Sequence, residues 1–138
     1  MTRRTRTAQK TKAKYDAIRN IGVLCVLLKL THPVTRHFWL NINDPRIDIP
    51  GLVEFSNLRP LSDTVVYVPY YMPQTHPKFG WTDERIVAEA FGYLKLVNPQ
   101  LTDADLKASR VGRLRYAQPV CEPGFLAKIP KVVTPIQG

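Results

Sequence analysis

The chain has 138 residues, a net charge of +9 and two cysteines. This length fits one domain that can bury a sizeable core, and it leaves little room for a second. The longest apolar run, from Ile21 to Leu30, is far shorter than the roughly 20 residues needed to cross a bilayer, and it contains Lys29. No membrane-spanning helix is therefore expected. Two cysteines do not form a disulfide framework, which favours a reduced, cytoplasmic setting.

The positive charge is concentrated at the N-terminus. Residues 1–19 carry seven Lys or Arg side chains against Asp16, a net of +6, so the other 119 residues carry only +3. This predicts a basic, flexible arm over residues 1–14 and a single domain over 15–138. The arm could make salt-sensitive contacts with nucleic acid, or it could simply be solvated. Because no aromatic residue interleaves its first fourteen positions, a nucleic-acid partner is not expected.

The first half of the chain predicts one helix and a meander of antiparallel strands. In the segment FWLNI, Phe38, Leu40 and Ile42 alternate with Trp39 and Asn41, so the two sets should occupy opposite faces of a strand. The Asn-Asp-Pro sequence that follows predicts a turn. We expect disorder over about residues 1–6, a helix over 7–19, and strands over 23–30, 38–42, 52–57 and 64–71. The uniformly apolar first strand should be central and buried on both faces.

The second half predicts a helix that begins after Thr82 and ends at Asn98-Pro99. Thr102 with Asp105 resembles a capping box for a short second helix. A last strand over 109–116 should lead into a proline-rich, extended tail. The apolar stripe of the first helix consists of Ile86, Val87, Ala90, Phe91, Leu94 and Val97. These elements predict an α+β fold, a mostly antiparallel sheet with helices packed on one face.

The sequence contains none of the short motifs that define a self-sufficient active site. It has no G-x-G-x-x-G, G-x-x-x-x-G-K-[ST], H-E-x-x-H, G-x-S-x-G or C-x-x-C. Two of its three histidines adjoin prolines in turns, so no metal site is expected. Cys121 has no neighbouring base and should be an ordinary thiol. Asp44, Asp48 and Glu54 could supply a general acid and base, although turn and surface roles also explain the two aspartates.

Aromatic and amide side chains suggest a cleft for a small molecule. Trp39 and Asn41 share a strand face, and rings with a few polar groups provide area and orientation to a ligand. The rings could equally close the sheet against its helices. Glu54, in VEFSN, should either meet solvent or line a polar cavity. The other aromatic candidates are Tyr67, Tyr70, Tyr71, Trp81 and Tyr116.

Several phrases in succession resemble FAD-dependent oxidoreductases of the flavin amine oxidase and protoporphyrinogen oxidase superfamily, with UDP-galactopyranose mutase a more distant relation. The phrases are FWLNINDPRIDIPGLVEFSNL, TVVYVPYYMP, FGYLKLVNP, SRVGRLRYAQPVCEPGF and IPKVVTPIQG. They extend over roughly residues 15–138 and are similar to the substrate-binding portion of that family. The resemblance implies a parent chain about three times longer, which holds FAD on a Rossmann-type unit that this sequence lacks.

The resemblance also implies which residues face the substrate. Trp39, Asn41, Asn43, Glu54 and Asn57 match a hairpin on the substrate side, and Arg110, Tyr116, Gln118 and Pro119 match the final sheet strand, which passes toward the flavin. Tyr70 joins them as a candidate for substrate binding. None of these residues is assigned as acid, base or nucleophile.

Three functions follow as hypotheses. The first is a fragment or split portion of an FAD-dependent oxidoreductase, which contributes the substrate domain, binds no FAD by itself, and is inactive without an FAD-binding partner chain or domain. The second is a stand-alone module that binds a small molecule without redox activity. The third is a basic nucleic-acid-binding protein, which ranks last.

Overall fold

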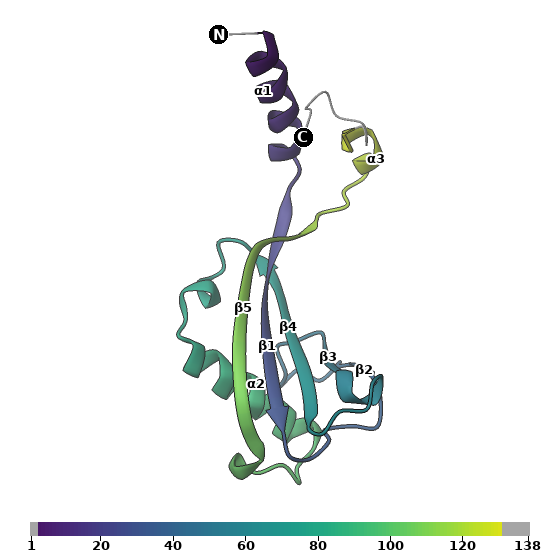
Figure 1. The fold of residues 1–138 in the computed structure, drawn as a ribbon, viewed down its shortest axis with the longest axis vertical. Coiled ribbons are helices and arrows are strands. Elements are labelled where there is room, and N and C mark those ends of the chain that lie inside the picture. Colours follow the sequence, from purple (N-terminus) through teal and green to yellow (C-terminus); the bar gives the residue numbers. More distant parts are fainter. Residues whose placement is uncertain (1–2, 131–138) are drawn as a thin grey trace.

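The computed structural model describes residues 3–130, which form an α+β fold around a five-stranded sheet (Figure 1). Every strand pairing is antiparallel, and the strand order is β2-β3-β4-β1-β5. The predicted fold class is confirmed. The strands are β1 (Asn20–Leu30), β2 (Trp39–Asn41), β3 (Gly51–Glu54), β4 (Thr64–Pro73) and β5 (Leu106–Pro119). The helices are α1 (Arg3–Asp16), α2 (Asp83–Val97) and α3 (Phe125–Lys128), and the 3₁₀ turns are η1 (Phe55–Asn57), η2 (Pro77–Gly80) and η3 (Asp103–Asp105).

The central strand β1 has one fully buried side. Its core-facing side chains, Leu24, Val26, Leu28 and Leu30, are all 0% exposed. On the opposite side Cys25 and Leu27 are half-buried and Lys29 is exposed. The central position is confirmed, but the expectation of burial on both faces was wrong, because no layer of the described chain fully covers the second side. An apolar strand sequence indicates that both faces of the strand are suited to burial, but it does not identify the residues that would cover them.

Helix α2 covers the core side of the sheet. Its N-terminus is capped as predicted, with the Thr82 hydroxyl accepting a hydrogen bond from the Arg85 amide at 3.3 Å. Ile86, Ala90, Phe91 and Leu94 are the buried part of the predicted stripe and join the β-strand core. Figure 1 shows α2 passing behind β1 and β5. We call the side of the sheet turned away from α2 the open face.

The β2–β3 hairpin is shorter than the sequence predicted. Strand β2 is limited to three residues, and β3 ends at Glu54, where the predicted strand over 52–57 gives way to η1. The turn after β2 forms as expected, with the Asp44 carboxylate accepting a hydrogen bond from the Arg46 amide at 3.0 Å. Strand β3 pairs with β4 at only two positions, Val53 with Tyr67 and Glu54 with Val66. Beyond these pairs, β4 continues without a strand on that side.

The two ends of the described chain lie together beyond one end of the sheet. Figure 1 shows α1 and α3 projecting from the extended ends of β1 and β5. Arg19 and Glu122 form an ion pair of 2.6 Å there. Helix α1 begins at residue 3 and ends at 16, earlier than the predicted 7–19, and α3 interrupts the tail that was predicted to be extended. The rest of that tail, residues 131–138, lies outside the described residues.

Two other predicted elements differ in detail. The short helix expected after Thr102 is the single turn η3, in which the Asp105 carboxylate accepts the Thr102 amide at 2.8 Å and the Thr102 hydroxyl at 2.9 Å. The last strand is longer than predicted and extends over the whole of β5. Within residues 3–130, no helix has the length and apolar character needed to span a membrane.

An ionic cluster at the end of the sheet where β1 ends and β5 begins gives the first testable prediction. Asp63 accepts from Lys107 and from Lys29, the latter at 2.7 Å, and these two ammonium groups lower the pKa of Asp63 to about 2. A depressed folded-state pKa contributes stability above the unfolded value of about 3.9, and that contribution is lost as the pH falls toward about 2. We expect Asp63→Asn to flatten the decrease in melting temperature between these pH values, measured by circular dichroism. Parallel decreases in both proteins would contradict this.

Candidate functional site

A single row of side chains crosses all five strands on the open face. The pairing registers place Trp39 opposite Val53, Val53 opposite Tyr67, Tyr67 opposite Leu27, and Leu27 opposite Arg110. Neighbouring strands lie about 4.8 Å apart, so the row extends roughly 19 Å from Trp39 to Arg110. These residues therefore form a broad wall with an aromatic edge, an apolar middle and a cationic edge.

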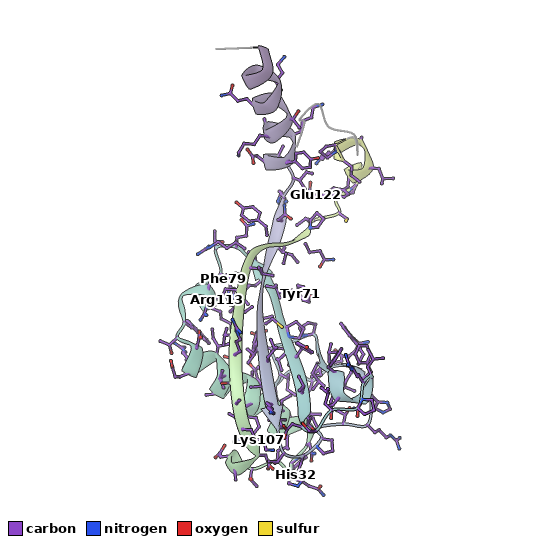
Figure 2. The ribbon with its side chains drawn as sticks, in the orientation of Figure 1. His32, Tyr71, Phe79, Lys107, Arg113 and Glu122 are labelled. Carbon is purple, nitrogen blue, oxygen red and sulfur yellow. The ribbon has the colours of Figure 1, made fainter. Side chains whose placement is uncertain are left out.

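Two further rows extend this wall along the strands. Tyr71, Val23 and Leu114 lie side by side, and both Tyr71, labelled in Figure 2, and Leu114 are about half exposed or more, at 49% and 60%. The neighbouring row contains Cys25 beside Gly112, a residue with no side chain to cover the thiol. Burial raises the pKa of the Cys25 thiol, which favours its neutral form. The open face thus presents apolar and aromatic surface with no activated nucleophile in these rows.

Trp39 and Asn41 lie together on the open face, as the alternation predicted. The Trp39 indole nitrogen donates a hydrogen bond to the Asn41 side-chain oxygen at 2.6 Å, and the Trp39 side chain is 52% exposed. Nearby, the Phe55 ring meets Tyr67 edge-on at a centroid distance of 5.9 Å. These contacts restrict the orientation of the Trp39 and Tyr67 rings, which belong to the row on the open face.

Glu54 is on the other side of the sheet from Trp39. It is 0% exposed, and its carboxylate accepts hydrogen bonds from the amides of Val34, at 3.3 Å, and Thr35, at 2.7 Å. Burial raises the pKa of Glu54, and these backbone bonds oppose that effect. The expectation that Glu54 meets solvent or lines a polar cavity was wrong. The carboxylate instead holds the loop that follows β1.

Asn57 and Tyr70 are not on the open face either: Asn57 is bonded to a loop, and Tyr70 lies in the interior. The Asn57 amide nitrogen donates to the carbonyl oxygens of Thr35 and His37, at 3.1 and 3.0 Å, and so fixes the same loop that Glu54 holds. Tyr70 is 3% exposed and faces the core side of β4. The structure therefore does not bring these two candidates together with Trp39.

The candidates on β5 are spread along the strand. Arg110 is in the Trp39 row, whereas Gln118 pairs with Ile21, six residues along β1 from Leu27 and so about 20 Å away. Tyr116 lies in the irregular pairing just before Gln118 and is 77% exposed. Tyr116 and Gln118 therefore belong to the projecting end of the sheet, apart from the Trp39 row.

The three hairpin carboxylates do not form an acid and base pair. Asp44 forms an ion pair with Arg46 at 2.6 Å, and the hydrogen bonds from Arg46 lower the pKa of Asp44 to about 2. Asp48 pairs with Lys78 at 3.0 Å, and Glu54 is bound to backbone amides. Each carboxylate has its own partners, so the three do not provide a paired acid and base.

These observations define the structural class of the protein. It is an α+β fold in which α2 covers one face of the antiparallel sheet and the other face is open (Figure 1). Several solved structures share this fold, including the following two. A protein described as a putative protoporphyrinogen oxidase from Exiguobacterium sp. 255-15 matches with a TM-score of 0.70 and 12% identity, over 93% of this chain and 30% of that one. Reduced UDP-galactopyranose mutase matches with a TM-score of 0.55 and 14% identity, over 84% of this chain and 28% of that one.

These likenesses concern the fold. The chain spans less than a third of the length of either protein. No protein-family model matches the sequence. A comparison with curated proteins gave no match either.

Proposed function

We propose that this chain is the substrate-binding part of an FAD-dependent oxidoreductase of the flavin amine oxidase and protoporphyrinogen oxidase type. The observation that carries the proposal is the shared fold, which includes nearly all of this chain and only 30% of a solved structure described as a putative protoporphyrinogen oxidase. This is an argument from fold, so the activity must be tested directly. The flavin-binding part would come from other residues, in a partner chain or in a longer protein.

The described residues do not fit the dinucleotide part of FAD. Such a site needs a parallel βαβ unit with a helix N-terminus open to the pyrophosphate. All strand pairings in residues 3–130 are antiparallel, and the N-terminus of α2 carries Asp83 and Glu84, whose charges repel phosphate. We therefore expect no FAD binding by this chain alone and assign no reaction step to its residues.

The open face has side chains suited to the substrate-binding part of such an enzyme. Tyr67, Leu27 and Val53 would contact apolar parts of a substrate, Trp39 would limit the cavity at one edge, and Arg110 could bind an anionic substituent at the other. In the assembled enzyme, the flavin would supply hydride transfer and these residues would position the substrate. This role also explains why apolar side chains on β1 remain only half-buried.

Co-expression tests the proposal. The chain would be produced with a candidate FAD-binding protein that carries a G-x-G-x-x-G motif, and flavin absorbance would be measured in the co-purified complex. We expect flavin only in the complex, together with oxidase activity. A flavin spectrum or activity in the chain alone would contradict the requirement for a partner. Binding of a small molecule to the chain with no flavin-dependent partner would favour the stand-alone binding module.

In the proposed enzyme the flavin-binding part would lie over the substrate-binding face, so a matched pair of variants tests whether the open face is also needed for assembly. Leu114→Lys places a charge on this face, and Leu96→Lys places one on the exposed side of α2, where the native leucine is 44% exposed. We expect the first variant to lower the yield of flavin complex at least tenfold and the second to leave it unchanged. Equal effects of the two variants would contradict a role of the open face in assembly.

A further inference from the structure

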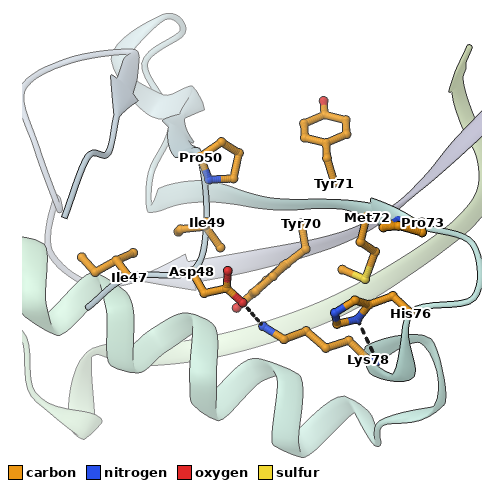
Figure 3. A pocket seen from close by; sticks show the side chains of 10 residues that line it. All are labelled: Ile47, Asp48, Ile49, Pro50, Tyr70, Tyr71, Met72, Pro73, His76 and Lys78. Atoms are coloured by element: carbon orange, nitrogen blue, oxygen red, sulfur yellow. Dashed lines mark hydrogen bonds and ion pairs between the residues drawn. The ribbon is translucent and has the colours of Figure 1, made fainter. Parts of the chain in front are cut away.

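A second candidate site lies on the core side of the sheet, apart from the open face. It is a cavity of about 350 Å³, and it lies where β4 extends past its pairs with β3. The segment 47–50 and turn η2 form its other walls. Figure 3 shows the Tyr70 ring pointing from β4 toward Asp48 and Lys78, whereas Tyr71 points to the other side.

Lys78 is the buried cation of this cavity. Its side chain is 8% exposed, and its ammonium group bonds Asp48 at 3.0 Å and Glu89 at 2.5 Å. The same nitrogen lies 4.7 Å from the centroid of the Tyr70 ring and 5.4 Å from that of Trp81. The ammonium group of Lys78 is thus bonded to two carboxylates and flanked by two rings, so an anionic ligand could bind Lys78 only by displacing a carboxylate.

The oxygen atoms of the cavity are not saturated. Lys78 contacts one oxygen of Asp48 and one of Glu89, and the other oxygens of these carboxylates accept no hydrogen bond within the described residues. The Tyr70 hydroxyl is buried without a hydrogen-bond partner, although Glu89 is close enough to contribute to raising the Tyr70 pKa, after the larger effect of burial. Two carboxylates against one ammonium leave a net charge of −1.

We propose that this cavity binds a small organic cation that carries a primary ammonium group. The ammonium would donate to the largely exposed Asp48 carboxylate and to the Tyr70 hydroxyl, and its alkyl part would lie against Ile49, Pro50 and Met72. Donors on the ligand match unsatisfied acceptors on the protein, and the positive charge of the ligand offsets the local excess of carboxylate. This site is independent of the proposed function and of any flavin.

Methionine-methyl NMR provides a direct test, because Met72 lines the cavity and is the single methionine of residues 3–130. The full chain, labelled at its methionine methyl groups, would be titrated with n-butylammonium chloride, and with sodium butanoate and 1-butanol as matched probes. We expect a saturable shift of the Met72 signal with butylammonium alone, measured against an added chemical-shift standard. A shift that does not saturate, or an equal response to butanoate or butanol, would overturn the proposal.

Two variants assign the binding to named groups. Asp48→Asn, at a side chain that is 79% exposed, should weaken butylammonium binding at least tenfold, and Tyr70→Phe should weaken it about threefold by removing one acceptor. The control is Asp103→Asn, at an 88% exposed aspartate that also pairs with a lysine, Lys95, and it should bind like the wild type. Unchanged binding in Asp48→Asn, or an equal loss in Asp103→Asn, would refute the assignment.

Discussion

Replacing Lys78 by methionine is expected to lower the free energy of unfolding by about 3 kcal/mol. The substitution keeps a long apolar stem but leaves the partly buried Glu89 carboxylate without its cation and removes the ammonium group from over the Tyr70 ring. Removing one member of a buried ion pair typically costs about 3–5 kcal/mol, and the exposure of Asp48 places the effect at the lower end. Urea unfolding followed by tryptophan fluorescence measures it, since Trp81 lies beside the Lys78 ammonium.

The control for this prediction is Lys95→Met. Lys95 also pairs with an aspartate, Asp103, at 2.8 Å, but Asp103 is 88% exposed and Lys95 is 37% exposed, so this pair is far less buried than that of Lys78. Exposed pairs of this kind contribute about 0–1 kcal/mol. If the two methionine variants lost equal stability, Lys78 would not be the buried connection between the 47–50 segment, η2 and α2 that its contacts indicate.

Glu54→Ala is expected to destabilise the fold by about 3 kcal/mol. The variant removes the acceptor of two amide hydrogen bonds, those of Val34 and Thr35, and leaves a cavity at a fully buried position. Glu54→Gln, which retains the volume and one acceptor oxygen, should lose only about 1 kcal/mol. Urea unfolding at pH 7 compares the variants, and wild-type stability in Glu54→Ala would contradict the proposed role in holding the loop.

The Glu54 carboxylate also has a defined effect on pH dependence. Burial raises its folded-state pKa, so its favourable contribution is fully present below the unfolded pKa of about 4.3 and decreases as the pH rises through the higher folded value. This effect is opposite in sign to that of Asp63. In Glu54→Gln the group no longer titrates, so this part of the pH profile should disappear.

The sequence predicted the elements whose pattern is long and periodic. The helix after Thr82, the central strand β1 and the β4 strand all appear, because capping, apolar periodicity and β-branched residues agree there. It failed at the end of β3, where alternation alone predicted a strand through Asn57. The bonds of Glu54 and Asn57 to the 34–37 loop lie about 20 residues away in sequence, and no local pattern contains such a contact.

Only part of the candidate site could be predicted in the same way. Alternation placed Trp39 and Asn41 on one face, as observed, but it does not reveal which residues of other strands lie beside them. Register provides that information, and it brings Leu27 and Val53 into the row. The ionic cluster of Asp48, Lys78 and Glu89 was missed because its three members come from three separate segments. The single signal for it was a lysine next to Phe79 in an otherwise apolar and turn-forming stretch.

The two edges of the sheet have a consequence for self-association. Strand β5 is an outer strand, and Arg110 and Arg115, which have no acidic partner among the described residues, would repel an identical strand. At the other side, the part of β4 beyond β3 carries Pro69 and Pro73, which cannot donate backbone hydrogen bonds. Fibril-like growth by strand addition is therefore disfavoured at both places, and any clustering of free chains should proceed through side-chain contacts between sheet faces.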